Sequence, residues 1–152
     1  MKQTEKLVAE NRRARFEYEL LDSFEAGIVL TGDEIKSIRA GHFSIVDCYG
    51  FIKNDECFLR NSYIKNYENS FDAGRTAKDE KRDRKLLLHK QEIEKIRKKI
   101  EQAGLTLVPT KAYFVEGLIK IEICLARGKK LYDKRETIKS RDIERDVKRF
   151  NK

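Results

Sequence analysis

Residues 118–126 alternate apolar and polar side chains, and this alternation constrains the fold more than any other feature of the sequence. The odd-numbered positions are apolar, namely Ile119, Ile121, Ile123 and Leu125. The even-numbered positions that oppose them are Lys120, Glu122 and Cys124. Successive side chains of a strand point to opposite faces of a sheet. The segment therefore predicts a strand with one face on a core and the other face on water or a ligand.

Two β-hairpins are predicted around tight polar turns. The clearer one joins residues 113–115 to residues 118–126 through Glu116-Gly117, and the other joins residues 49–53 to 57–59 through Asn54-Asp55. Residues 16–20 also alternate with charges, and residues 28–30 form an apolar run after Gly27. These segments predict a chain that is mainly β.

Two helices interrupt the predicted strands. Residues 32–40 carry Ile35 and Ile38 on one side and end at Gly41, while residues 83–103 keep helical apolar spacing and end at Gly104. Residues 66–82 show no periodicity and predict an exposed, mobile loop. We expect an OB-fold-like antiparallel β-barrel with two or three α-helices. A ferredoxin-like α+β sandwich competes, but it expects a regular βαβ order that the sequence lacks.

The basic charge is concentrated at the C-terminus. The chain of 152 residues carries a net charge of +8, and residues 129–152 hold 10 basic and 5 acidic side chains. This segment contains too few apolar residues to fold alone. We expect residues 1–128 to form the barrel and residues 129–152 to form a basic tail, which is disordered when free and helical when phosphates neutralise it. Such a basic excess favours a polyanionic partner, and RNA is the first candidate.

Several other classes are disfavoured. The sequence has no run of about 18 apolar residues and no signal-peptide pattern, so we expect a cytoplasmic protein that does not enter membranes. Its cysteines, Cys48, Cys57 and Cys124, are odd in number and widely spaced, which supports neither a zinc ribbon nor a disulfide framework. We expect no cofactor and no bound metal.

Signals of catalysis are weak. The two histidines, His42 and His89, lack metal-binding spacing, and no phosphate-binding loop or nucleophile elbow is present. The acidic pairs Asp33-Glu34 and Asp55-Glu56 could hold Mg²⁺ in an RNA-processing enzyme, although solvated carboxylates at a helix start and a turn are the simpler interpretation. A protein that is not an enzyme is therefore expected.

Signals of RNA binding are stronger. Residues 11–16, with the sequence NRRARF, place three guanidinium groups and an amide beside an aromatic ring, a combination suited to phosphates and stacked bases. Residues 82–85 and 126–130 add further basic clusters, each of which could also be a solvated charged face. Glu25 lies where a strand pattern turns, either as an exposed carboxylate or as an acceptor for RNA hydroxyl groups.

Longer motifs resemble a known family. The segments NRRAR at 11–15, EAGIVLTG at 25–32 and EIKSIRAG at 34–41 resemble the first half of the SsrA-binding proteins, also called small protein B. RKLLLH at 84–89 and GLTLVP at 104–109 resemble the middle of that family, and LARGKKLYDKR at 125–135 resembles its last barrel strand and the start of its tail. The resemblance runs from about residue 10 to about residue 150 in the family's order.

This resemblance implies an OB-fold barrel that acts in bacterial trans-translation, the rescue of stalled ribosomes. The implied partners are the tRNA-like part of transfer-messenger RNA, elongation factor Tu with the alanylated RNA, and the ribosome. The barrel would replace the missing anticodon arm. The tail would enter the vacant message channel of the small subunit, become helical at the decoding site and permit tagging of the nascent chain. A monomer is expected. A generic OB protein without a task for its tail stays open.

The resemblance and the basic clusters together indicate which residues form the expected binding sites. The expected RNA-binding residues are Asn11, Arg13, Arg15, Glu25, Lys36, Arg39, Leu87, Lys120 and Arg127. The expected tail residues at the decoding site are Gly128, Lys129, Lys130, Tyr132, Asp133, Lys134 and Arg135. Some family members carry His at position 132, and either ring can stack on a base. Core packing within the long helix is the alternative for Leu87.

Overall fold

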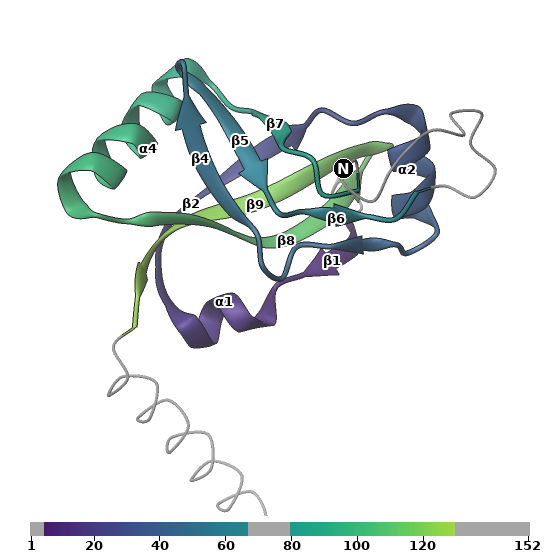
Figure 1. Cartoon of the computed structure of the whole chain (residues 1–152), viewed down its shortest axis with the longest axis horizontal. Coiled ribbons are helices and arrows are strands. Elements are labelled where there is room, and N and C mark those ends of the chain that lie inside the picture. The colour runs from purple at the N-terminus through teal and green to yellow at the C-terminus, as the bar shows by residue number, and fades with distance from the viewer. Residues whose placement is uncertain (1–4, 67–79, 130–152) are drawn as a thin grey trace, which may run out of the picture.

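The computed structural model describes residues 5–66 and 80–129 of the chain (Figure 1). Its strands are β1 (Glu5–Glu10), β2 (Tyr18–Ile28), β3 (Phe43–Ser44), β4 (Tyr49–Lys53), β5 (Glu56–Arg60), β6 (Tyr63–Ile64), β7 (Arg84–Leu87), β8 (Thr106–Val115) and β9 (Leu118–Gly128). The helices in this part are α1 (Arg12–Glu17), α2 (Gly32–Arg39) and α4 (Lys90–Ala103). None of them is long and apolar enough to cross a membrane.

The main sheet is antiparallel and closes on itself. Its order is β1-β8-β4-β5-β7-β2-β9, and β8 also pairs with β9, so that six strands form a ring. One edge of β8 pairs with β9, whereas its other edge is shared by β1 and β4. The β4–β8 seam is short, with the single pair Gly50 and Leu107. The predicted fold class, an OB-like antiparallel barrel with two or three helices, is confirmed, although the barrel closes unevenly.

The interior of the barrel holds the apolar side chains that the sequence alternation predicted. Ile121, Ile123 and Leu125 of β9 are fully buried, and Ile119 is 8% exposed. Helix α4 covers one end of the barrel, where its Ile96 enters the same core, and α2 lies at the other end (Figure 1). The ends of the barrel are thereby closed by helices, and its side wall is left as the available surface.

Helix α1 covers part of that side wall. Ala14 packs against Val108 of β8 and Ala126 of β9 in a small cluster outside the barrel. Cys124 shares the outer face of β9 with Lys120 and Glu122, but it lies next to this cluster. It is therefore only 4% exposed and does not belong to an open polar surface. The outer face of the β2–β9–β8 wall is therefore open only toward the hairpin turn that joins β8 to β9.

Two segments differ from the predicted elements. Residues 16 and 17, predicted as the start of a strand, belong to α1, because Asn11 caps this short helix and Ala14 anchors it. Residues 84–87 form β7 instead of the first turn of the long helix. Leu86 has helical spacing from Ile93, but it pairs with Ile28 of β2 and Cys57 of β5 inside the barrel.

Helix α4 begins only after His89. The backbone N–H of His89 donates to the Glu92 carboxylate at 3.0 Å, a common way to satisfy the first amides of a helix. At the other end, Gly104 takes the left-handed conformation with φ of 62°, as the sequence predicted for a helix stop. The predicted loop at 66–82 lies largely outside the described residues.

Candidate nucleic-acid interface

The open part of the side wall brings together three residues from three strands. Gly27 of β2 is paired with Lys120 of β9 on one side and with Leu87 of β7 on the other. Glu25, two residues earlier on β2, points to the same outer face and is exposed. A hollow of about 310 Å³ is lined by Glu25, Leu87 and Lys120 together with the start of α4. The structure thus places these three expected site residues around one depression.

A second hollow adjoins the first and is more apolar. Its volume is about 330 Å³, and Leu87 and Lys120 line it together with Ile35 of α2 and Leu118 at the start of β9. Leu118 is 63% exposed and Leu87 is 52% exposed, and the two leucines line the same hollow as an exposed apolar patch. The two hollows form a groove with a carboxylate at one end, a lysine in the middle and apolar side chains at the other end.

Leu87 is placed on this surface by its strand. Neighbouring residues of β7 alternate between faces, so that Leu86 is 1% exposed inside the barrel while Leu87 is 52% exposed outside it. The alternative of core packing within the long helix is wrong, because residue 87 lies on a strand.

Tyr113 lies buried beneath this surface, and it was not predicted from the sequence as a site residue. Its hydroxyl donates to Glu25 at 2.5 Å, and its ring is directly opposite Lys120 in the β8–β9 register. The ammonium of Lys111 lies 5.4 Å from the centre of the same ring. The signal was present: a two-residue turn at 116–117 places residue 113 opposite residue 120. Tyr113 therefore fixes the orientation of the Glu25 carboxylate.

The basic residues of α1 form a separate cluster. Arg13 and Arg15 are exposed, and Arg13 contacts Glu17 and Asp47. Asn11 is 4% exposed, and its amide donates to the Pro109 carbonyl while its oxygen caps the Ala14 amide. Asn11 therefore holds α1 on the barrel and positions its arginines, and its own amide is directed inward.

The chain leaves the barrel beside the same helix. Arg127 pairs with Glu19 of β2, and Lys129 donates from its ammonium to the Arg15 carbonyl. Gly128 is the last residue of β9 and is exposed. The expected decoding-site residues Lys130, Tyr132, Asp133, Lys134 and Arg135 lie outside the described residues.

The two expected basic residues of α2 lie at the other end of the barrel. Lys36 and Arg39 are exposed, and the guanidinium of Arg39 lies 5.8 Å from the ring centre of Phe114. Figure 1 shows α2 and α1 on different sides of the barrel, with the strand wall between them. The expected RNA-binding residues are therefore spread over α1, the wall and α2, and only Glu25, Leu87 and Lys120 share one depression.

Glu34 of the first acidic pair is engaged by two arginines of the protein itself. Glu34 is fully buried, and its two oxygens accept from Arg82 at 2.5 Å and from Arg84 at 2.6 Å. Burial raises the pKa of Glu34, but the hydrogen bond from Arg82 and the further contacts with Thr31 and Arg84 outweigh it and hold the pKa below its ordinary value. A carboxylate in this setting binds arginine and does not offer itself to Mg²⁺.

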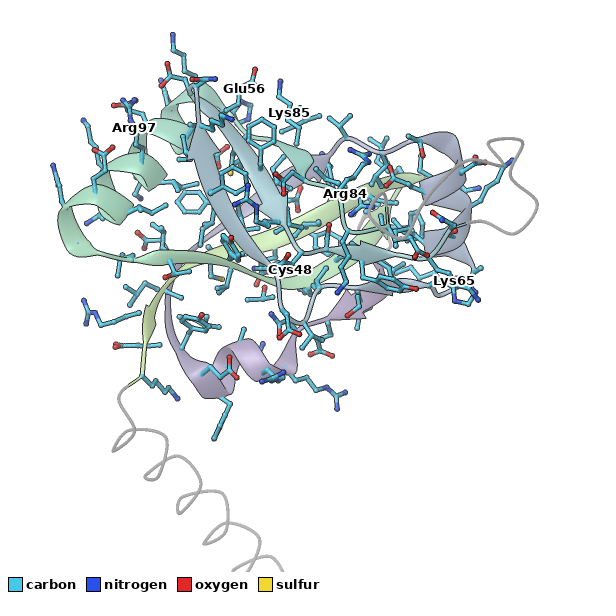
Figure 2. All side chains as sticks on the ribbon, viewed as in Figure 1. Cys48, Glu56, Lys65, Arg84, Lys85 and Arg97 are labelled. Atoms are coloured by element: carbon cyan, nitrogen blue, oxygen red, sulfur yellow. The ribbon has the colours of Figure 1, made fainter. Side chains whose placement is uncertain are left out.

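The second acidic pair makes ion pairs at the surface. Asp55 accepts from Arg97 at 3.0 Å, and Glu56 lies 3.4 Å from the Lys85 ammonium. Figure 2 shows Glu56 and Lys85 at the outer surface and Arg84 within the body of the barrel. Within residues 5–66 and 80–129, no group of three or more metal-ligating side chains is found. Glu34 is therefore committed to its arginines, while Asp55 and Glu56 make only exposed ion pairs.

The three cysteines are packing residues. Cys48, Cys57 and Cys124 are free and buried. Burial raises the pKa of both Cys48 and Cys57 to about 12, so these thiols stay protonated at neutral pH. A protonated, buried thiol is a poor nucleophile and a poor metal ligand.

Comparison with known proteins agrees with the motifs. A model of the SmpB protein family matches residues 8–152. An SsrA-binding protein from Gloeothece citriformis is 52% identical over 147 residues, which cover 97% of this chain and 94% of that protein. One from Chlorobaculum tepidum is 52% identical over 144 residues, covering 93% of this chain and 89% of that protein.

A solved structure is also similar. It is described as "tmRNA-SmpB: a journey to the center of the bacterial ribosome", and it matches with a TM-score of 0.64 and 48% sequence identity. The match covers 80% of this chain and 84% of that chain. Sequence motifs, family match and barrel agree over nearly the whole length, and the chain therefore belongs to the SmpB protein family.

Proposed function

We propose that this protein binds the tRNA-like part of transfer-messenger RNA and carries it to stalled ribosomes in trans-translation. Its similar proteins are named for binding SsrA RNA, and the similar solved structure is described with transfer-messenger RNA and the bacterial ribosome. The observation that carries the proposal is the grouping of Glu25, Leu87 and Lys120 around one depression of the barrel wall.

The chemistry of that depression suits a folded RNA. The lysine supplies a cation for a phosphate, and the carboxylate supplies an acceptor for a 2′-hydroxyl or a base amino group. The exposed leucine offers an apolar contact to a ribose or a base. A site with only one such group would bind any polyanion, whereas three different groups within one depression can recognise a particular RNA shape.

The remaining expected residues have supporting roles in the proposal. Arg13, Arg15 and Arg127 contact phosphates beside α1, and Asn11 acts by holding that helix. Lys36 and Arg39 contact phosphates at the opposite end of the barrel. The protein acts in the bacterial cytoplasm as a monomeric adaptor that catalyses no reaction, with elongation factor Tu as a further partner of the complex.

The basic tail has a separate task in the proposal. Residues 1–128 hold the RNA, while residues 129–152 occupy the vacant message channel and the decoding site of the small subunit. The start of the tail directs it toward the message channel, through Gly128, Lys129 and Lys130. Tyr132, Asp133, Lys134 and Arg135 contact the decoding site, which permits tagging of the nascent chain. The path of β9 past α1 supports this arrangement, since it separates the start of the tail from the groove around Lys120.

Substitution in the groove tests the RNA site. Glu25→Ala and Lys120→Ala should each weaken binding to a tRNA-like transcript at fixed salt by about 1–3 kcal/mol, roughly 5- to 150-fold. Lys99→Ala is the matched control, because it removes the same charge from an exposed position of α4. Equal losses for Lys120→Ala and Lys99→Ala would reduce the site to general electrostatic attraction.

Substitution in the tail tests the division of labour. A variant with Ala at positions 133, 134 and 135 should bind the tRNA-like transcript nearly as tightly as the parent chain yet fail to tag nascent chains on stalled ribosomes. A loss of affinity for the transcript in place of a loss of tagging would mean that the tail is a phosphate anchor.

A further inference from the structure

A second stretch of the barrel wall carries a ladder of stacked side chains. In the β4–β5 hairpin, Gly50, Cys57 and Leu59 face the core, which places the intervening positions on the outer surface. Phe51 and Phe58 are directly paired across the hairpin, with ring centres 5.5 Å apart and an angle of 24° between the rings. Both rings are half-buried and stacked side by side.

A guanidinium group extends the ladder. The Cζ atom of Arg60 lies 4.3 Å from the ring centre of Phe51. Asp83 holds this guanidinium by two parallel hydrogen bonds of 3.1 Å, from Nε to one carboxylate oxygen and from Nη2 to the other. Nη1 of Arg60 also lies 3.5 Å from the Tyr49 hydroxyl. The fork is thus fixed in place before any ligand arrives.

The fixed guanidinium is still at the surface. The side chain of Arg60 is 44% exposed and that of Asp83 is 42% exposed. Two lysines border the ladder on the same face. Lys85 of β7 pairs with Phe58 in the sheet, and Lys53 shares the outer face at the end of β4. The surroundings therefore combine planar groups, which stack on bases, with cations, which attract phosphates.

The ladder is separate from the groove around Lys120. Strand β7 lies between them, with Lys85 beside the ladder and Leu87 in the groove two residues later. A strand of RNA that crosses β7 would meet both. A cross-strand pair of phenylalanines alone is accounted for by hairpin stability. An arginine fixed by a carboxylate and laid near the ring of the pair is a feature that hairpin stability does not require.

From this arrangement we propose that Phe51, Phe58 and Arg60 form a stacking platform for an unpaired RNA base, a second nucleic-acid contact beyond the groove around Lys120. The occupant is a single-stranded nucleotide, because the planar guanidinium over the Phe51 ring and the pair of stacked rings offer surfaces on which a base can stack. Lys53 contacts a phosphate beside it, and Lys85 exchanges its exposed ion pair with Glu56 for the phosphate on the other side. The platform has no preference among bases, since every base has a π-face.

Fluorescence quenching of a base analogue tests the platform. A short single-stranded RNA with one 2-aminopurine is titrated into the full-length protein, beside an RNA of equal length in which that one nucleotide is abasic. Stacking should quench the 2-aminopurine, and the base-containing RNA should bind about tenfold more tightly than the abasic one. Equal affinities for the two RNAs, or binding without quenching, would overturn the proposal.

Two conservative variants locate the effect. Arg60→Lys keeps the positive charge and removes the planar fork, while Phe58→Leu keeps an apolar side chain and removes the ring. Each should abolish most of the difference between the two RNAs while leaving binding of the abasic RNA unchanged. Thermal unfolding verifies that both variants are folded, and if either variant keeps the full tenfold difference, the base stacks elsewhere.

Lys120→Ala separates the platform from the groove. This variant should retain quenching and the difference between the two RNAs, because β7 lies between the two surfaces. Loss of the difference in Lys120→Ala, with Arg60→Lys unaffected, would assign the base to the groove and overturn the platform. Weak binding of the tRNA-like transcript by Lys120→Ala concerns only the proposed function and leaves the platform test intact.

Discussion

At the scale of single residues, the most demanding feature is a buried ion cluster. Glu34 and Arg84 are both fully buried, and Arg84 also donates to the backbone and side chain of Ser62. The Glu34 carboxylate reaches back to the Thr31 amide and completes a capping box at the start of α2. The cluster joins α2 to β7 and the segment before β6. A charge removed from one partner would leave the other buried without its counter-charge.

Glu34→Gln should therefore destabilise the fold by about 3–5 kcal/mol, the usual cost of breaking a buried ion pair from one side. Chemical denaturation at neutral pH measures this loss. Glu101→Gln is a suitable control, because it makes the same change at an exposed position of α4. A loss below 1 kcal/mol would mean that the cluster is no more than a surface contact.

The same cluster predicts a dependence of stability on pH. The pKa of Glu34 is lowered from its ordinary value of 4.5 in the folded state, so its contribution to stability is fully present above about pH 4.5. That contribution is lost as the pH falls through the folded-state pKa. The free energy of unfolding should therefore decrease below pH 4.5, and Glu34→Gln should flatten part of this decrease. An unchanged pH profile in the variant would contradict the assignment.

Tyr113 offers a test that removes one atom. Tyr113→Phe deletes the hydroxyl that fixes Glu25, so affinity for the tRNA-like transcript should fall about 2- to 10-fold. The dependence of the binding constant on salt should stay the same, because no phosphate contact is lost. Tyr63→Phe on β6 is the matched control. Unchanged affinity, or a changed salt slope, would show that Tyr113 does not act through Glu25.

At the scale of elements, barrel closure between β4 and β8 rests on one glycine. A Cβ atom at Gly50 would lie 2.5 Å from Cδ2 and 2.9 Å from Cγ of Leu107. Leu107 is fully buried in the main core, so its side chain has little room to give way. The two strands approach closely only because residue 50 has no side chain. This seam has the fewest paired residues of the ring, and its closeness also sets the end of the hairpin that carries the aromatic ladder.

Gly50→Ala should cost about 1–3 kcal/mol, the usual penalty for forcing an extra carbon into a packed core. Urea denaturation measures the loss. Gly32→Ala is a matched control, because nothing lies within 4 Å of a Cβ added there. Equal stabilities of the two variants would mean that the seam adjusts freely.

At the scale of the whole molecule, the barrel keeps three regions apart: the groove around Lys120, the aromatic ladder, and the point beside α1 where the chain leaves the barrel. Helices α2 and α4 close its ends, α1 covers one part of the wall, and the rest of the wall is available to ligand (Figure 1). The groove around Lys120 and the aromatic ladder share that wall, while the chain leaves it beside α1. This arrangement suits the proposed function, in which the barrel holds one RNA while the tail reaches another site.

A chain ending at Lys129 tests this separation. It keeps the contacts of Lys129 with Arg15 and Glu17, so its thermal stability should equal that of the parent within a few degrees. Its affinity for the tRNA-like transcript should fall less than tenfold, and its salt slope should change by about one unit or less. Tagging on stalled ribosomes should be lost. A slope reduced by several units would identify the tail as a phosphate anchor.

Much of the fold was predictable because it depends on local patterns. The alternation of β9, the two-residue turn before it and the glycine after α4 each determine a local conformation through sterics or burial. Helix α1 and the boundary between β7 and α4 were not predictable in this way. Leu86 fits a helical pattern and a strand pattern equally well, and only its partners on β2 and β5 decide between them.

In the candidate site too, some features follow from local sequence patterns and others depend on tertiary contacts. Lys120 was predicted to face outward because its neighbours on β9 are apolar, and the structure agrees. The exposure of Leu87, the inward role of Asn11 and the bond between Tyr113 and Glu25 depend on contacts between strands distant in sequence. Sequence by itself determined the two hairpins, the end of α4, the charge asymmetry and the family. Only the tertiary structure decided which residues share a surface, because strand pairing across the barrel brings together positions that no local pattern connects.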